Sequence, residues 1–263
     1  MKVRGVSHIH SKYSYDGTLS LSEIKKALVK EGLRFALMTE HTDELTEVEA
    51  KKFIRECKEL SDKDFIFVSG FEVPYRKAHI LMIGVQEFVV SHADDITLPQ
   101  WKEHAAFSVL AHPHCNQFIV DTVMKVVVDA VEIWNAQYDG KYIPRFKAVK
   151  LLNYLQKTRD TKAFCGLDLH RKEHLGGPEI VMEMEQLTTK KILEKIRRGE
   201  YTMEKKTMSV SSKGKITNST SFLAVKSFCA IVFIVFSKWL GKKLHKHGLS
   251  VPKELKQKIR SKI

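Results

Sequence analysis

The chain has 263 residues, 43% of them hydrophobic and 29% charged, which is enough apolar sequence for a buried core and argues against intrinsic disorder. The formal net charge is +13, but residues 1–204 contain 30 basic and 30 acidic residues, whereas residues 205–263 contain 14 basic residues and one acid. The first 204 residues are therefore net neutral, which argues against a body built to follow a long polyanion such as nucleic acid.

The predicted elements alternate between short apolar runs and amphipathic segments, as in repeated βα units with a parallel sheet. The predicted strands are Val3–His8, Phe35–Thr39, Phe65–Gly70, Ile80–Gly84, Ser108–Ala111, Ala130–Ile133 and Ala163–Gly166. The predicted helices are Leu21–Glu31, Thr46–Leu60, Leu98–Ala106, Val120–Val127, Pro144–Lys157 and Thr188–Arg198. This order fits either an open doubly wound sheet or an incomplete relative of the eight-stranded barrel. In both folds the functional face is the carboxyl end of the strands.

Two sequence features restrict the classes of cofactor that the protein could bind and the cellular compartment in which it could lie. The first strand is followed by no glycine-rich dinucleotide motif, and no Gly-Lys-Ser/Thr loop occurs, so nucleotide-cofactor binding loses its main support. The four cysteines, at 57, 115, 165 and 229, are far apart and form no Cys-x-x-Cys pair, and there is no secretory signal. We expect reduced thiols and a cytoplasmic protein.

The first strand ends in a His-x-His pair, His8 and His10, whose side chains point to the same side because side chains alternate along a strand. Both imidazoles can therefore reach one metal ion. Asp16 follows in a loop rich in Tyr, Ser and Gly that is long enough to return over the strand end.

Later strands also deliver metal-ligand residue types to the same end. The full candidate set is His8, His10, Asp16, His41, Glu72, His79, His112, Asp168 and His170. Imidazole and carboxylate without thiolate suit Zn, Mn or Fe, with Mg as a further option, and so many ligands imply two or three ions. A carboxylate such as Glu72 has two oxygens and can bridge two ions. Clustered divalent ions favour hydrolysis of phosphate esters, because one ion activates water while others hold phosphoryl oxygens.

The motifs Thr39-Glu40-His41-Thr42-Asp43, Gly70-x-Glu72, His79-Ile-Leu, Ala111-His-Pro-His114 and Gly166-x-Asp168-x-His170, together with His-x-His, resemble the PHP family, named for polymerase and histidinol phosphatase. The resemblance covers roughly residues 1–204. It implies a distorted (β/α)7 barrel with a trinuclear metal site and phosphoesterase activity. Two positions depart from the family pattern: Asp16 stands where some members have His, and the second motif reads Thr-Glu-His instead of Thr-Asp-His.

The resemblance also implies how the ligands divide among three ions. His8, His10, Glu72 and Asp168 would hold one ion, Glu72, His79 and His112 a second, and Asp16, His41 and His170 the third. We assign the catalytic roles to His10, Asp16, Glu72 and Asp168. Near the same face, Arg171 and Arg76 are candidates to hold phosphate oxygens, and Asn135 either binds substrate or caps its loop.

Beyond residue 204 the composition changes. We expect a linker over residues 205–220, rich in Lys, Ser and Thr, and then a basic extension over 221–263 with an apolar helix. The apolar run 228–236 is too short to span a bilayer. A helix packed on the barrel, an interfacial membrane anchor and a marginal transmembrane segment all remain open, as does a nucleic-acid-binding arm. The extension could place a cytoplasmic protein at an anionic membrane surface.

Three functions are therefore in competition. The first is a metal-dependent phosphatase acting on a small phosphomonoester, such as a nucleotide or a histidinol-phosphate-like metabolite. The second is a PHP-type exonuclease that trims oligonucleotides. The third is a non-catalytic PHP module, which the complete ligand set argues against.

Overall fold

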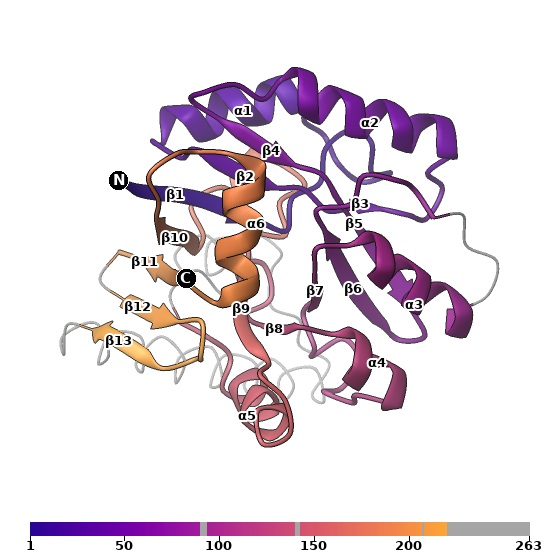
Figure 1. Cartoon of the computed structure of the whole chain (residues 1–263), viewed down its shortest axis with the longest axis vertical. Coiled ribbons are helices and arrows are strands. Elements are labelled where there is room, and N and C mark those ends of the chain that lie inside the picture. The colour runs from indigo at the N-terminus through magenta and orange to yellow at the C-terminus, as the bar shows by residue number, and fades with distance from the viewer. Residues whose placement is uncertain (90–93, 140–142, 207, 220–263) are drawn as a thin grey trace, which may run out of the picture.

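The computed structural model describes residues 1–89, 94–139, 143–206 and 208–219 (Figure 1). Within them the strands form two mixed sheets. The first runs in the order β13-β12-β11-β10-β1-β2-β4 and the second in the order β3-β5-β6-β7-β8-β9. The first sheet contains β1 (Lys2–Ser7), β2 (Phe35–Leu37), β4 (Ile66–Val68), β10 (Glu179–Glu183), β11 (Thr202–Lys205), β12 (Met208–Ser211) and β13 (Ile216–Ser219). The second contains β3 (Glu40–His41), β5 (Gly70–Tyr75), β6 (Ala78–Ile83), β7 (Phe107–Leu110), β8 (Ala130–Asn135) and β9 (Lys162–Gly166).

The helices lie around these sheets, with α1 and α2 side by side along one edge of the molecule and α5 at the opposite edge (Figure 1). Their bounds are α1 (Leu21–Lys30), α2 (Glu47–Glu59), α3 (Asp94–His104), α4 (Thr122–Val127), α5 (Phe146–Leu155) and α6 (Thr189–Arg198). The capping box expected at Thr46 and Glu49 is confirmed, because each side chain accepts from the other residue's backbone N–H. Each of the six helices predicted from sequence overlaps one of these.

The resemblance implies a distorted (β/α)7 barrel; the described chain has the α/β class with mixed sheets, and it does not show a closed barrel. Strand β6 is antiparallel to both of its neighbours, β5 and β7, and β1 pairs in parallel with β2 but antiparallel with β10. The two sheets are nevertheless connected where the functional residues lie. The backbone N–H groups of Leu167 and Leu169 donate to Ser7 O at 2.9 Å and to His8 O at 3.1 Å, so the chain after β9 lies beside the carboxyl end of β1.

The predicted linker over residues 205–220 is wrong for its described part. Strands β12 and β13 form an antiparallel hairpin that continues the first sheet outward from β11. The polar side chains of these strands hide the strand signal in the sequence, although Val210 is fully buried. The predicted basic extension over 221–263 lies outside the described residues. Within the described part of the chain, no helix has the length and apolar character needed to cross a membrane.

Candidate metal centre

The structure brings all nine predicted ligands to one place at the ends of strands from both sheets. They are His8 and His10 after β1, Asp16 in the following loop, His41 on β3, Glu72 on β5, His79 on β6, His112 after β7, and Asp168 and His170 after β9. We call these nine residues the histidine-carboxylate centre. The loop carrying Asp16 is folded back by backbone hydrogen bonds, among them Gly17 N to Ser14 O at 3.1 Å and Thr18 N to His170 O at 2.9 Å.

Glu72 lies in the middle of the centre and its two carboxylate oxygens face different imidazoles. Oε2 lies 3.2 Å from Nε2 of His8, 3.2 Å from Nε2 of His10 and 3.4 Å from Nδ1 of His41. Oε1 lies 2.8 Å from Nδ1 of His79 and 3.0 Å from Nε2 of His112. This is the arrangement expected of a carboxylate that bridges two cations.

The two aspartates extend the centre through contacts with His8, His41 and His170. Oδ1 of Asp168 lies 3.4 Å from Nε2 of His8 and 3.6 Å from Nδ1 of His170. The carboxylate of Asp16 lies 3.0 Å from Nε2 of His170 and 3.6 Å from Nε2 of His41. Asp168 thus lies beside His8 and His170, and Asp16 lies beside His41 and His170.

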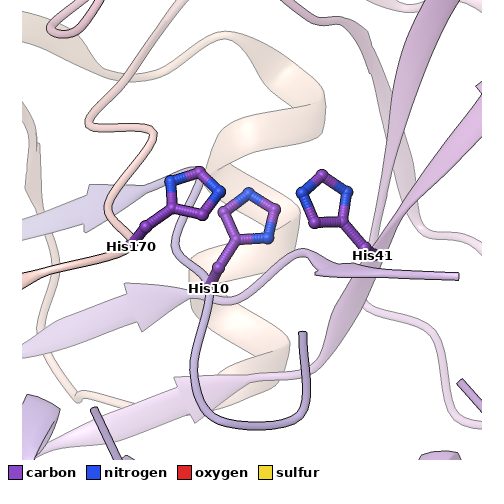
Figure 2. A group of neighbouring side chains, drawn as sticks. All are labelled: His10, His41 and His170. Carbon is purple, nitrogen blue, oxygen red and sulfur yellow. The ribbon is translucent and has the colours of Figure 1, made fainter. Parts of the chain in front are cut away.

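Three imidazoles from distant parts of the chain lie side by side, with His10 between His41 and His170 (Figure 2). The ring centroids of His10 and His41 are 4.3 Å apart, as are those of His10 and His170. One nitrogen from each ring lies within 4.8 Å of one nitrogen from each of the others. The same spacing occurs in three further groups, namely His8, His10 and Glu72; His8, His112 and Asp168; and Glu72, His79 and His112.

The unsatisfied atoms of the centre test whether these residues fit a metal. Nε2 of His10, Nε2 of His170 and Oδ1 of Asp16 are buried and make no hydrogen bond of acceptable geometry, although the two nitrogens lie 3.2 Å and 3.0 Å from the carboxylates of Glu72 and Asp16. Buried polar atoms are normally hydrogen-bonded, and lone pairs left free in one pocket are what a divalent cation needs. The residues present therefore fit several divalent ions, held by nitrogen and oxygen atoms alone.

Burial and neighbouring carboxylates set the charge states in this centre. Burial lowers the pKa of His10 to about 3, so this imidazole is neutral and keeps a lone pair. At His8 burial also lowers the pKa, but the charges of Asp168, Glu132 and Glu72 outweigh it and raise the pKa well above its usual value. Carboxylates that hold a proton on a fully buried imidazole create a strongly negative site, which would attract cations.

Three of the nine residues adopt positive φ angles, which non-glycine residues seldom do. The values are 57° for His8, 22° for His112 and 52° for Asp168. Such backbone costs free energy and persists where surrounding structure holds it, most often at functional sites. Here each of the three residues immediately follows a strand or lies two residues beyond it, and its side chain turns into the centre.

Glu132 on β8 is a functional candidate that the sequence reasoning missed. Its carboxylate is fully buried and accepts from three groups: Nδ1 of His8 at 2.8 Å, the backbone N–H of His112 at 2.7 Å and Nδ2 of Asn135 at 3.0 Å. A carboxylate on one imidazole nitrogen directs the lone pair of the other nitrogen toward a metal. The available signal was a single acid inside the otherwise apolar run Ala130–Ile133.

The close packing of Glu132 against His8 requires a glycine at position 166, at the end of β9. A Cβ atom on Gly166 would lie 2.1 Å from Oε1 of Glu132 and 2.6 Å from Cβ of His8. Any larger residue would push the two side chains apart. The Gly-x-Asp-x-His motif thus supplies both a ligand-bearing turn and the space for the Glu132–His8 contact.

Glu40 is a second buried carboxylate that the sequence reasoning did not include. It accepts from the backbone N–H of Ser11 at 3.0 Å and from Oγ of Ser14 at 2.6 Å. Ser14 Oγ in turn accepts from the backbone N–H of His41 at 2.9 Å and lies 3.2 Å from Nδ1 of His10. Glu40, which replaces the Asp of the Thr-Asp-His pattern, therefore fixes the loop that contains Ser11 and Ser14. Ser14 in turn contacts both His10 and His41.

The three predicted substrate residues have different surroundings. Arg171 directly follows His170 and is exposed, with no hydrogen bond or ion pair of its guanidinium among the described residues. Arg76 donates to Asp121 at 2.8 Å. Asn135 is fully buried: it donates to Glu132 and, at 3.3 Å, to Asp168, and it accepts from the backbone N–H groups of Gln137 and Tyr138. Its amide thus caps the loop after β8 and orients a ligand carboxylate.

Fold and centre together define an α/β protein with a histidine-carboxylate site suited to several divalent metals. The chain belongs to the PHP family: the family model for the PHP domain matches residues 7–204. This confirms the resemblance drawn from the motifs.

Two solved structures share the fold. One is a two-domain protein from Bacteroides vulgatus described as containing a predicted PHP-like metal-dependent phosphoesterase, with a TM-score of 0.62 and 12% identity over 80% of this chain and 67% of that one. The other is PsfC from Pseudomonas syringae, with a TM-score of 0.53 and 14% identity over 87% of this chain and 97% of that one. No curated protein sequence matches the chain.

Proposed function

We propose that this chain is a metal-dependent phosphoesterase that hydrolyses a small phosphomonoester, such as a nucleotide or a histidinol-phosphate-like metabolite. The observation that carries the proposal is the position of Glu72, whose two oxygens each face a separate set of imidazoles within 3.4 Å. The description of the Bacteroides vulgatus neighbour agrees with this reaction class.

The nine residues of the centre would hold two or three ions of Zn, Mn or Fe. His8, His10, Glu72 and Asp168 would bind one ion, Glu72, His79 and His112 another, and Asp16, His41 and His170 the third. When bound, such ions lower the pKa of a water ligand toward neutrality and neutralise charge on phosphoryl oxygens.

Two residues outside the ligand set hold ligand side chains in position. Glu132 fixes the ring of His8, and Asn135 holds the carboxylate of Asp168, so the ligands are ordered before any substrate arrives. We propose that Arg171, which is exposed and follows His170 directly in the sequence, binds phosphate oxygens that do not react. Arg76 would take that role only by leaving Asp121.

A small substrate is supported by the net charge of residues 1–204. Residues 1–204 carry equal numbers of basic and acidic residues, and a nuclease that follows a polyanionic strand generally needs a positive groove. A phosphomonoester needs only the ions and one or two cationic side chains.

The test compares substrates on the same protein loaded with Mn or with Zn. We expect hydrolysis of nucleoside monophosphates or of p-nitrophenyl phosphate, with little release of nucleotides from short single-stranded oligonucleotides. The variant Asp168→Asn controls for contaminating phosphatases. Higher kcat/KM on oligonucleotides would favour a nuclease, and no hydrolysis of either substrate by metal-loaded protein would favour a non-catalytic module.

A further inference from the structure

An apolar patch lies on α4, on α5 and on the segment just before α4. Four large hydrophobic side chains are exposed there: Phe146 at 71%, Val126 at 71%, Ile119 at 64% and Tyr154 at 56%. We call these residues, with the lysines described next, the α4/α5 patch. Single exposed apolar residues are common, but Tyr154 lines the same cavity as Phe118 and Val120, which flank Ile119 in the chain, and apolar residues gathered in this way indicate an interaction surface.

A cavity of about 380 Å³ lies within this patch, with Phe118, Val120 and Tyr154 among the residues that line it. Three lysines line it as well, and each ammonium group lies near an aromatic ring. Nζ of Lys125 is 5.7 Å from the ring of Tyr154, that of Lys147 is 5.9 Å from the ring of Phe118, and that of Lys150 is 4.7 Å from the ring of Phe146. None of the described residues that line the cavity is acidic, so these residues present apolar and positive groups to it.

The exposed face of α5 is not needed to hold the helix on the protein. The opposite face, with Ala148 and Leu152, is fully buried and packs on β8. Phe146, Lys147, Lys150 and Tyr154 recur at helical spacing on the outer side, where they contribute no buried core. Their apolar and cationic character therefore points to something outside the described chain.

We propose that the α4/α5 patch docks on the surface of a membrane containing anionic phospholipids. Phe146, Val126 and Ile119 would enter the boundary between head groups and acyl chains, and the three lysines would approach the lipid phosphates. Each lysine near an anionic surface adds to the attraction, and the inserted apolar side chains add to it further.

The positive charge of the C-terminal extension argues against the extension as the partner of the α4/α5 patch and favours an anionic membrane. The β12–β13 hairpin, from which the extension follows, lies beside α5: Gln156 Nε2 donates to Lys213 O at 3.3 Å, and Gly214 lies close to Leu152. Residues 205–263 contain 14 basic residues against one acid, so the extension and the patch would repel each other. Two basic, partly apolar regions of one chain both suit the same negative surface.

The test measures partition of the full chain onto vesicles of phosphatidylcholine alone and of phosphatidylcholine with phosphatidylserine. We expect binding only with phosphatidylserine. The triple variant Lys125→Glu, Lys147→Glu, Lys150→Glu should bind at least about tenfold more weakly. The matched control Lys26→Glu, Lys30→Glu, Lys52→Glu makes the same charge change on α1 and α2 and should lose much less.

A second variant tests the apolar contribution. Phe146→Ser with Val126→Ser keeps the charge and removes the side chains proposed to insert, and its binding to the same vesicles should also fall. Equal loss in the two triple-lysine variants, or unchanged binding of Phe146→Ser/Val126→Ser, would overturn the proposal. So would tight binding of a single-stranded oligonucleotide that depends on the three patch lysines while the vesicles are not bound.

Discussion

Nδ1 of His8 lies 2.8 Å from Oε1 of Glu132, and Nε2 of the same ring lies 3.2 Å from Oε2 of Glu72. One ring nitrogen thus contacts the carboxylate of Glu132, which also accepts from the backbone N–H of His112. The other ring nitrogen contacts Glu72, the central carboxylate of the site. The consequence is that His8 is fixed in ring orientation by a residue that is not itself among the nine ligands. Substituting Glu132 therefore tests whether it positions His8 for metal binding.

Glu132→Gln should weaken metal binding about 10- to 100-fold without unfolding the protein. An amide nitrogen facing Nδ1 of His8 would favour the tautomer that carries its proton on Nε2, which removes the lone pair directed at the metal. Competition with a chromogenic chelator measures the affinity. Glu185→Gln, an exposed acid, is the control, and equal affinities of the two variants would contradict the positioning function.

Removing the metals should lower the thermal stability of the protein. Ions that bind the folded centre and not the unfolded chain stabilise by mass action, about 2.7 kcal/mol at a free concentration 100 times the dissociation constant. Adding Mn or Zn to chelator-treated protein should raise Tm, and Glu72→Gln should reduce that rise because it weakens both sets of ligands. A Tm that does not respond to metal would argue against the centre.

Asp168→Asn and His10→Ala should each abolish phosphoester hydrolysis and keep the fold. Asp168→Asn replaces a charged carboxylate by a neutral amide, and His10→Ala removes an imidazole, in groups whose nitrogen and oxygen atoms lie within 4.8 Å of one another. Circular dichroism checks the fold, and steady-state rates check activity. Rates equal to those of the unmodified protein in either variant would mean that the centre is not where hydrolysis occurs.

Asp139 predicts a pH dependence of stability outside the ligand set. Burial raises the pKa of its carboxyl to about 6, although a backbone hydrogen bond from Asn135 and the charge of Arg145 oppose this. The native state therefore holds the proton more tightly than the unfolded chain, and the free energy of unfolding falls as pH rises from about 4 to about 6, by at most about 3 kcal/mol. Asp139→Asn should reduce this fall in metal-free urea unfolding, and an unchanged pH profile would contradict the assignment.

The sequence predicts which side chains gather in the centre better than it predicts the strands of the two sheets. His8, Glu72 and Asp168 are recognisable because polar residues directly after apolar strands stand out against their neighbours. Strand β5 was missed because Glu72 and Pro74 interrupt its apolar pattern, and the β12–β13 hairpin was missed because its side chains are mostly Ser, Thr and Asn.

Glu132 and Glu40 were missed for a different reason. Their contacts, with His8 on one side and with Ser11 and Ser14 on the other, join segments separated by many residues in the chain. Spacing within a motif carries no information on such contacts. A buried acid in an apolar strand is the only sign, and it does not reveal the partner.

Metal content measures the central claim most directly. The purified chain, incubated with excess Mn or Zn and then freed of loosely bound ions, should contain at least two equivalents of metal by mass spectrometry, and Glu72→Gln should contain fewer. Less than one equivalent in the unmodified protein would contradict a centre in which Glu72 bridges ions.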